Sequence, residues 1–311
     1  MNIYESVTSR ILKQLEAGVL PWRKTLLLGL PKNLTNNREY HGINILLLGA
    51  VPYRSRYWAT AGEVRELGGQ ILEGAEPTPT IYWRIPTPEA AHSSKTPPGP
   101  KKQHGAAPFV VRAFNLDQSQ GIDRPSDDAD SSRKRCLQLA DLVFDVMPDK
   151  PTILHTKVAT ARYNPDGDQV ILPHLSQLKD VGDYYRELFK QLVRATGHAR
   201  RLNRFRLAGN DSGEPALFEE LVAELGAAFL CGFTGIAPAD CRPPEVKQVA
   251  GWVEAIRGDN RLLARAASAA QKASDYIRGK LPPQGILGAS NPVLRSLSRD
   301  ILPVTSGALH P

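Results

Sequence analysis

Residues 190–194 read Lys190-Gln191-Leu192-Val193-Arg194 and lie in the middle of an amphipathic stretch that runs from residue 183 to residue 198. The apolar positions of this stretch recur every three or four residues, which predicts a helix over about residues 180–196. Residues i and i+4 lie on one face of a helix, so Lys190 and Arg194 are expected side by side. Taken alone, the pentapeptide is typical of any amphipathic helix, and the sequence around it has to decide its meaning.

A helix that binds zinc through the motif His-Glu-x-x-His has its two histidines four positions apart, as Lys190 and Arg194 are here, but the pentapeptide has none of the three motif residues. In that motif the two histidines present lone pairs to one Zn²⁺, and the glutamate polarises the bound water as a general base. Neither arginine nor protonated lysine has a lone pair to donate, and Gln191 cannot take a proton. The three residues therefore predict no hydrolysis by a metal-activated water at this position.

The flanking segments carry a resemblance that the pentapeptide lacks. These segments are Tyr184-Tyr185, Thr196-Gly197-His198, Arg201-Leu202-Asn203-Arg204 and Glu219-Glu220-Leu221-Val222-Ala223-Glu224-Leu225. In this order they resemble the zincin-like metallopeptidase domain of ArdC-like antirestriction proteins. The resemblance implies a zincin-like fold with His-Glu-x-x-His at residues 190–194 and a third metal ligand at Glu220.

Since the motif is replaced, the metal site is expected to be lost, with no catalytic residue, no bound metal and no cofactor. We expect Glu220 to face Lys190 and Arg194 in a partly buried ion cluster, which needs good geometry to offset desolvation. The other candidate ligands are histidines at spacings that no metal motif requires, and they are not expected to rescue the site. They are His155, His174 and His198.

The first part of the chain carries a second, independent resemblance. Its segments include Gly18-Val19-Leu20-Pro21-Trp22, Tyr40-His41-Gly42-Ile43-Asn44 and Phe114-Asn115-Leu116-Asp117-Gln118. They are similar to the N-terminal domain of ArdC-type proteins. This resemblance implies that the segment binds single-stranded DNA.

Binding of single strands without sequence preference needs cations for the phosphate backbone and exposed rings for stacking on bases. The candidate cations are Arg23, Lys24, Lys32, Arg38, Arg54 and Arg56, and the candidate rings are Trp22, Tyr40, Tyr53, Tyr57 and Trp58. Residues 53–57 interleave rings with cations and are the strongest of these candidates. The alternative for Trp22 and Trp58 is burial in the core.

The charge of the chain also favours a polyanionic partner. The net charge is +7 and the pI is near 9.3. Residues 1–115 contain 14 Lys and Arg against 8 Asp and Glu, so most of the excess lies there. Apolar runs are too short to span a bilayer, and the three cysteines have no disulfide or zinc spacing. A reducing cytoplasm and no membrane partner are expected.

The pattern predicts an α+β protein with two domains. We expect a small mixed domain over residues 1–120, a linker over 121–137, a mostly helical zincin-like domain over 138–285 and a flexible tail over 286–311. Helices are predicted near residues 3–16, 180–196, 215–233, 245–257 and 260–278, and strands near 43–48, 80–85, 109–114, 159–163 and 169–172. The proline-rich residues 86–108 are expected to form a mobile loop.

We expect a single-stranded-DNA-binding antirestriction or conjugation-accessory protein with an inactive peptidase-like domain, and the resemblance to ArdC-like proteins implies that it protects incoming plasmid or phage strands. A host restriction or defence protein is a further expected partner. Two alternatives stay open. One is a zinc-dependent peptidase with non-standard ligands, and the other is a module that captures a host protein.

Overall fold

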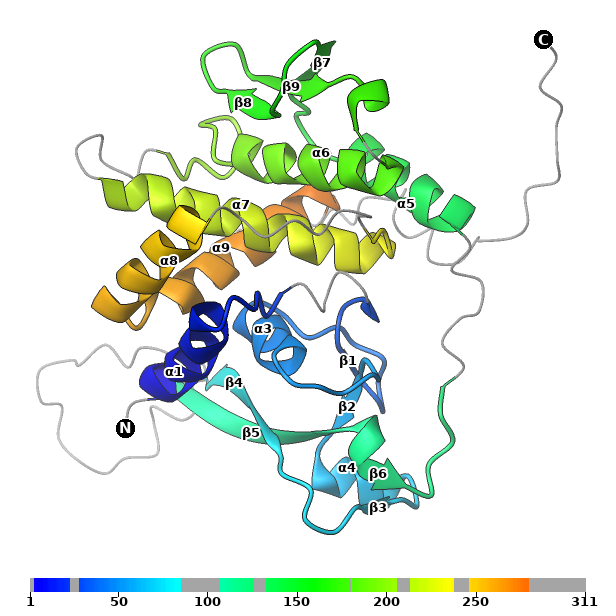
Figure 1. Ribbon diagram of the computed structural model, residues 1–311. Helices are drawn as coiled ribbons and strands as arrows, with labels where there is room; N and C mark the ends of the chain where they lie inside the picture. Colours follow the sequence, from blue (N-terminus) through cyan, green and yellow to red (C-terminus); the bar gives the residue numbers. More distant parts are fainter. Residues whose placement is uncertain are drawn as a thin grey trace, which may run out of the picture.

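The computed structural model describes residues 3–22, 28–84, 107–125, 133–178, 180–205, 213–237 and 246–279. Residues 86–106 of the expected mobile loop and the whole expected tail lie outside these ranges. The fold is α+β, as predicted, with a strand-rich part below a stack of helices and a small sheet above them in the view of Figure 1.

The strand-rich part is built from the first 120 residues. Its elements are α1 (Ile3–Glu16), β1 (Lys32–Asn33), α3 (Ile43–Gly49), β2 (Tyr57–Ala59), α4 (Ala61–Glu66), β3 (Gln70–Ile71), β4 (Thr78–Arg84), β5 (Ala107–Asn115), η2 (Leu116–Gln118) and β6 (Ser119–Gln120). The main sheet has the order β1-β2-β5-β4, with β1 parallel to β2 and the other pairs antiparallel. Strands β3 and β6 form a separate antiparallel pair.

The strand predicted over residues 43–48 is wrong, because this segment is helix α3. A short, continuous apolar run has the same composition in a buried helix as in a buried strand, so its periodicity does not separate the two. Here the helix lies against β4, and the Asn44 amide fastens it there. Asn44 Nδ2 donates to the carbonyl of Ile81 at 2.9 Å, and the Ile81 amide donates to Asn44 Oδ1 at 2.7 Å.

The second half is mostly helical. Its elements are α5 (Arg133–Asp145), β7 (Thr152–Thr156), β8 (Arg162–Asn164), β9 (Gln169–Pro173), η3 (Leu175–Gln177), α6 (Val181–Ala195), α7 (Gly213–Thr234), α8 (Val246–Gly258) and α9 (Leu262–Ile277). The four predicted helices correspond to α6–α9. The predicted strand pair is present as antiparallel β8 and β9, to which β7 adds a parallel strand that the sequence did not predict. Helix α5, which begins inside the expected linker, was not predicted either.

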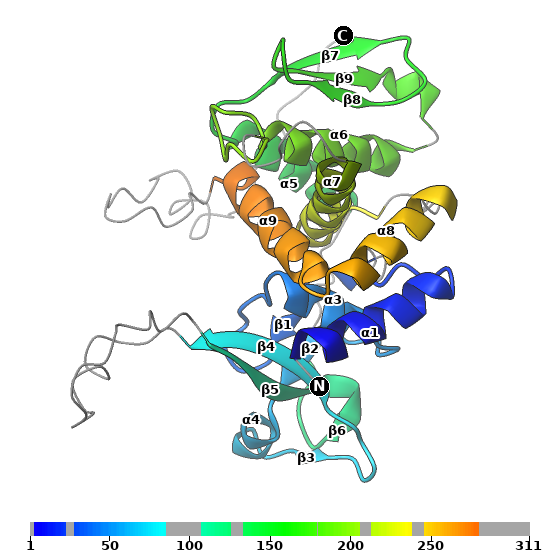
Figure 2. The ribbon, with the colours of Figure 1, turned by 90° about the vertical axis from the view of Figure 1, so that its left-hand side faces the viewer.

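One hydrophobic core joins the two halves. Helix α1 packs on α8 and α3 packs on α9, and Figure 2 shows these four helices stacked between the two sheets. The indole rings of Trp22 and Trp252 meet edge to face, with centroids 5.9 Å apart. An ion pair of 3.1 Å between Arg278 Nη1 and Glu39 Oε2 adds a polar link. The domain boundaries at residues 120 and 138 stay predictions.

None of the described helices is both long and apolar enough to cross a membrane.

Candidate functional site

The candidate site lies where helices α6 and α7 pack against each other. The N-terminus of α6 is capped by Asp180, whose Oδ1 accepts a 2.7 Å hydrogen bond from the Val181 amide. The close approach of the helices depends on Gly226 of α7, since a Cβ there would come within 2.7 Å of a Val193 methyl group. This contact sets the α6 residues 186–194 opposite the α7 residues 219–224.

Lys190 lies between two carboxylates of α7. Its Nζ is 2.5 Å from Glu224 Oε1 and 2.9 Å from Glu220 Oε1. One turn earlier on α6, Arg186 Nη2 contacts Glu224 Oε2 at 3.0 Å. Glu224 is therefore held by two cations from the facing helix.

Arg194 completes the cluster at its other end. Its guanidinium pairs with Glu220 Oε2, and Gln248 Nε2 of α8 donates to Glu220 Oε1 at 2.7 Å. The predicted contacts of Glu220 with Lys190 and Arg194 are thus present. The sequence reasoning missed Arg186, Gln248 and the central role of Glu224, although residues 186, 190 and 194 recur every four positions and so line one helix face.

The cluster is charged and largely removed from water. The exposed fraction of the side chain is 6% for Glu224, 15% for Lys190 and 19% for Glu220. Burial raises the pKa of Glu224, but the charges of Lys190 and Arg186 outweigh it, and the net effect lowers that pKa below its ordinary value. Burial also lowers the pKa of Arg194. The Glu224 carboxylate is therefore ionised at neutral pH and is neutralised by the α6 cations.

This donor set does not fit a divalent metal ion. Lys190 and Arg194 occupy the two positions from which histidines would coordinate, and both carboxylates of α7 are already engaged by cations. Gln191 is 3% exposed, and its Oε1 has no hydrogen-bond partner in the described structure. Nowhere in the described ranges do three or more His, Cys, Asp or Glu side chains group closely enough to hold a metal ion, and the three candidate histidines, His155, His174 and His198, belong to no such group.

Two further ion pairs fix the turn that follows α6. Arg204 binds Glu219 of α7 through Nε at 3.1 Å and Nη2 at 3.0 Å, and its Nη1 donates to Thr196 Oγ1 at 2.7 Å. Arg201 binds both carboxylate oxygens of Asp168, at 2.8 and 2.9 Å, and so ties the turn to the β8–β9 hairpin. Bidentate pairs of this kind fix orientation as well as distance.

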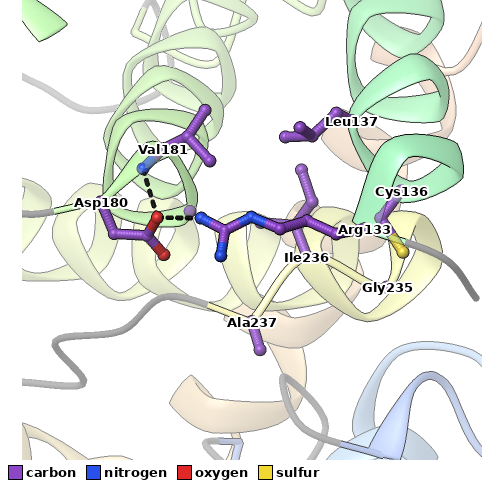
Figure 3. A pocket seen from close by; sticks show the side chains of 9 residues that line it. Arg133, Cys136, Leu137, Asp180, Val181, Gly235, Ile236 and Ala237 are labelled. Atoms are coloured by element: carbon purple, nitrogen blue, oxygen red, sulfur yellow. Dashed lines mark hydrogen bonds and ion pairs between the residues drawn. The ribbon is translucent and has the colours of Figure 1, made fainter.

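A small cavity of about 220 Å³ lies away from the cluster, between α5, the start of α6 and the end of α7 (Figure 3). Its rim carries the ion pair between Arg133 and Asp180, and Cys136 and Ile236 line its wall. Cys136 is buried and free. Arg133 and Asp180 bind each other, so neither is left unpaired to bind a ligand in the cavity.

The structure places most of the predicted stacking rings in the interior. Trp22, Tyr57 and Tyr40 are 2%, 7% and 8% exposed, so as folded they present no face to a base. Burial is also what raises the pKa of the Tyr40 hydroxyl above its ordinary value. Tyr53 is half-buried and packs edge to face on Trp58, which is itself buried. The expectation that Trp22, Tyr40 and Tyr57 offer rings for stacking is corrected by their burial.

Of the four predicted cations that the structure describes, two are exposed at the surface. Arg38 and Arg54 are exposed, whereas Lys32 and Arg56 are half-buried. Arg56 lies over the ring of Tyr57, with 5.4 Å from Cζ to the ring centroid. Arg23 and Lys24 lie outside the described residues. The structure brings Arg54 next to η2, where its amide donates to Asp117 Oδ2 at 2.8 Å.

Two families match this chain, one in each half. Residues 1–116 match the N-terminal domain of anti-restriction factor ArdC. Residues 145–269 match a zincin-like metallopeptidase family. These matches confirm both resemblances inferred from the sequence.

Individual relatives show the same likeness over most of the chain. An uncharacterized protein, y4eC, of Sinorhizobium fredii is 28% identical over 90% of this chain and 92% of its own. The DNA primase TraC of Escherichia coli is 27% identical over 88% of this chain. The matched region is only 27% of that primase. Among solved structures, the antirestriction protein ArdC from plasmid R388 is similar in a metal-free form and a Mn(II)-bound form, with a TM-score of 0.71 for each. The two forms are 28% and 29% identical, and each match covers 90% of this chain and 98% of the other.

These findings overturn the expectation that no metal or cofactor is involved. A similar ArdC protein has been solved with Mn(II) bound, and the second half of this chain matches a metallopeptidase family, so the comparisons point to a metal rather than none. The cluster at residues 186–224 does not provide its ligands, and the described residues do not reveal another set. The replacement of the motif at residues 190–194 does not by itself exclude a metal from the rest of the protein.

Proposed function

Since the chain joins an ArdC-type N-terminal domain to a zincin-like metallopeptidase domain, we propose that it is an antirestriction protein that binds single-stranded DNA and does not hydrolyse peptides at residues 190–194. The DNA that it binds is a strand that enters the cell, for example by conjugation. The second partner that we propose is a restriction or other defence protein of the host. We also propose that it works in a reducing cytoplasm, where the buried thiol of Cys136 stays free.

The proposal that residues 190–194 do not hydrolyse peptides rests on the ion cluster between α6 and α7. Hydrolysis by a zincin requires a water activated by a metal and a general base close to it. At this position Lys190 binds Glu220 and Glu224, and Gln191 has no basic group. On this proposal a charged network between α6 and α7 takes the place of the catalytic groups.

Three features support the proposal that the protein binds single-stranded DNA. The N-terminal family match covers residues 1–116, which carry most of the excess positive charge. Exposed Arg38 and Arg54 lie in this half. Relatives include a protein named as a DNA primase and one named as an antirestriction factor, and both names concern proteins that work with DNA.

The DNA-binding part is tested by an electrophoretic mobility shift. We expect the full chain to retard a single-stranded oligonucleotide more strongly than its duplex, and the affinity to fall steeply with salt because cations on the protein displace counterions from phosphates. Arg54→Ala should weaken binding, whereas Arg162→Ala, an exposed arginine of β8, serves as the matched control. Equal retardation of both DNA forms, or none, would count against the proposal.

The peptidase part is tested with a fluorogenic protein substrate in the presence of added Mn²⁺ or Zn²⁺. We expect no turnover above that of the heat-treated protein. Proteolysis that a chelator abolishes would contradict the proposal. A Glu224→Ala variant locates any such activity, because loss on this substitution would assign the activity to the cluster.

A further inference from the structure

The exposed aromatic rings of this protein gather on the ribbon formed by β4 and β5. Trp83, Tyr82 and Phe109 are 44%, 39% and 38% exposed. Every other aromatic residue whose burial the structure describes is half-buried or buried, including all the rings predicted to stack on bases. Val110 of the same ribbon is 45% exposed. Such a concentration of exposed apolar side chains on a single element marks an interaction surface.

The strand register places these side chains on both faces of the ribbon. Tyr82 lies opposite Phe109, with ring centroids 5.9 Å apart, so the two rings share one face. Trp83 and Val110 lie on the other face, because neighbouring residues of a strand alternate sides. Strand β4 is at the edge of its sheet. Figure 2 shows the C-terminal end of β4 projecting past α3 and α4.

Positive charge accompanies the rings. Arg112 of β5 is exposed and pairs in register with Pro79, which puts it on the same face as Val110 and Trp83. The ribbon therefore carries a cation on the same face as Trp83, in a half of the protein that is already basic.

We propose that the exposed rings of this ribbon, Trp83 on the face of Val110 and Arg112 and Tyr82 with Phe109 on the other face, stack on the bases of single-stranded DNA. The inference rests on the proposed function and names its contact surface. Stacking tolerates any base, since every base has a π-face, and a nearby cation binds the backbone. A duplex hides those faces, so the surface selects single strands. A second copy of this chain pairing along β4 would need no cation and is the competing occupant.

Tryptophan fluorescence offers a direct test with the full chain. The protein has four tryptophans, of which Trp22, Trp58 and Trp252 are at most 2% exposed. We expect an oligothymidylate to quench the emission of Trp83. Trp83→Phe should abolish the quenching yet bind within about threefold of the parent, because a phenyl ring still stacks.

Affinity measurements complete the test. Trp83→Leu and Phe109→Leu keep apolar surface but lose the ring, and each should weaken binding roughly tenfold. The matched control is Leu175→Ala, an exposed apolar residue (52%) of η3, which should bind like the parent. Melting temperatures close to that of the parent will show that each variant is folded.

The outcomes separate this inference from the proposed function. If the parent protein does not bind the oligonucleotide, the proposed function fails and this inference fails with it. If the parent binds and the leucine variants bind equally well, the inference is overturned and the proposed function stands. If the leucine variants change the mass measured by light scattering while DNA binding is unaltered, a second copy occupies the ribbon and the inference is likewise overturned.

Discussion

Lys190 of α6 and Glu224 of α7 form an ion pair of 2.5 Å between Nζ and Oε1, with both side chains largely shielded from solvent. The pair joins two helices that are separated along the chain by a turn and a further segment. Its value to the fold depends on both charges being present, since a buried charge without its partner is costly.

Removal of the Lys190 charge should therefore destabilise the protein. We expect Lys190→Met, which keeps the length of the side chain, to lower the free energy of unfolding by about 3 kcal/mol, because a buried carboxylate loses a partner. Lys150→Met is the matched control, since the pair of Lys150 with Asp145 is 3.7 Å long and exposed, and it should cost less than about 1 kcal/mol. Urea denaturation measures both. Equal effects would show that the cluster contributes no more than a surface pair.

The lowered pKa of Glu224 predicts a dependence of stability on acid. The unfolded chain has the ordinary carboxyl pKa, near 4.5, and the folded chain has a lower one. The unfolded state therefore takes up the proton first, so the stabilisation is complete above pH 4.5 and is lost as the pH falls through the folded pKa.

Denaturation from pH 6 to pH 3 checks this dependence. Glu224→Gln should be less stable than the parent at pH 6, and the difference should shrink toward pH 3. Glu16→Gln, which affects an exposed pair with Arg257, should follow the parent throughout. A difference between Glu224→Gln and the parent that stays constant with pH would refute the assignment.

The contact of Gly226 with Val193 predicts that a single methyl group disturbs the site. A Cβ at Gly226 would lie 2.7 Å from a Val193 methyl carbon, so Gly226→Ala should force α6 from α7 at a cost of about 1–3 kcal/mol. Gly251→Ala is the control. Its Cβ would make an ordinary 3.5 Å contact with Leu217, and removing a helical glycine should stabilise the chain by about 0.5–1 kcal/mol. Val193→Ala should recover part of the loss in Gly226→Ala, as a melting curve would show.

The meeting of Trp22 with Trp252 predicts that the two halves unfold together. Either substitution by alanine should cost about 3–5 kcal/mol, and the double variant should cost less than the sum by about 0.5–1.5 kcal/mol. A double-mutant cycle in urea measures this coupling. Two separate unfolding transitions, one for each half, would contradict a shared core.

Helices with a strong period were the most predictable part of the fold. The apolar stripes of α1, α6 and α9 lie at helical spacing and have the predicted bounds within a few residues. Helix α3 escaped prediction because residues 43–48 are all buried, and a helix buried on every side has no periodic apolar face to detect.

The sequence predicted which two segments form the candidate site, but only some of the residues that meet there. Spacing on one helix brought Lys190 and Arg194 together, and the family pattern supplied Glu220. The dominant partner, Glu224, depends on the angle at which α7 crosses α6, which no spacing along the chain gives. The same limit applies to Trp22, whose burial depends on Trp252, far away in the sequence.

The common core of the helices has a consequence for how this fold can be inherited. Helices from both ends of the described chain, α1 and α8 or α3 and α9, complete one interior, so a cut between them leaves two fragments with exposed apolar faces. A protein that contains this fold keeps the shared interior only while both halves are present. The match to TraC spans both halves, because it extends over 290 residues of that much longer chain.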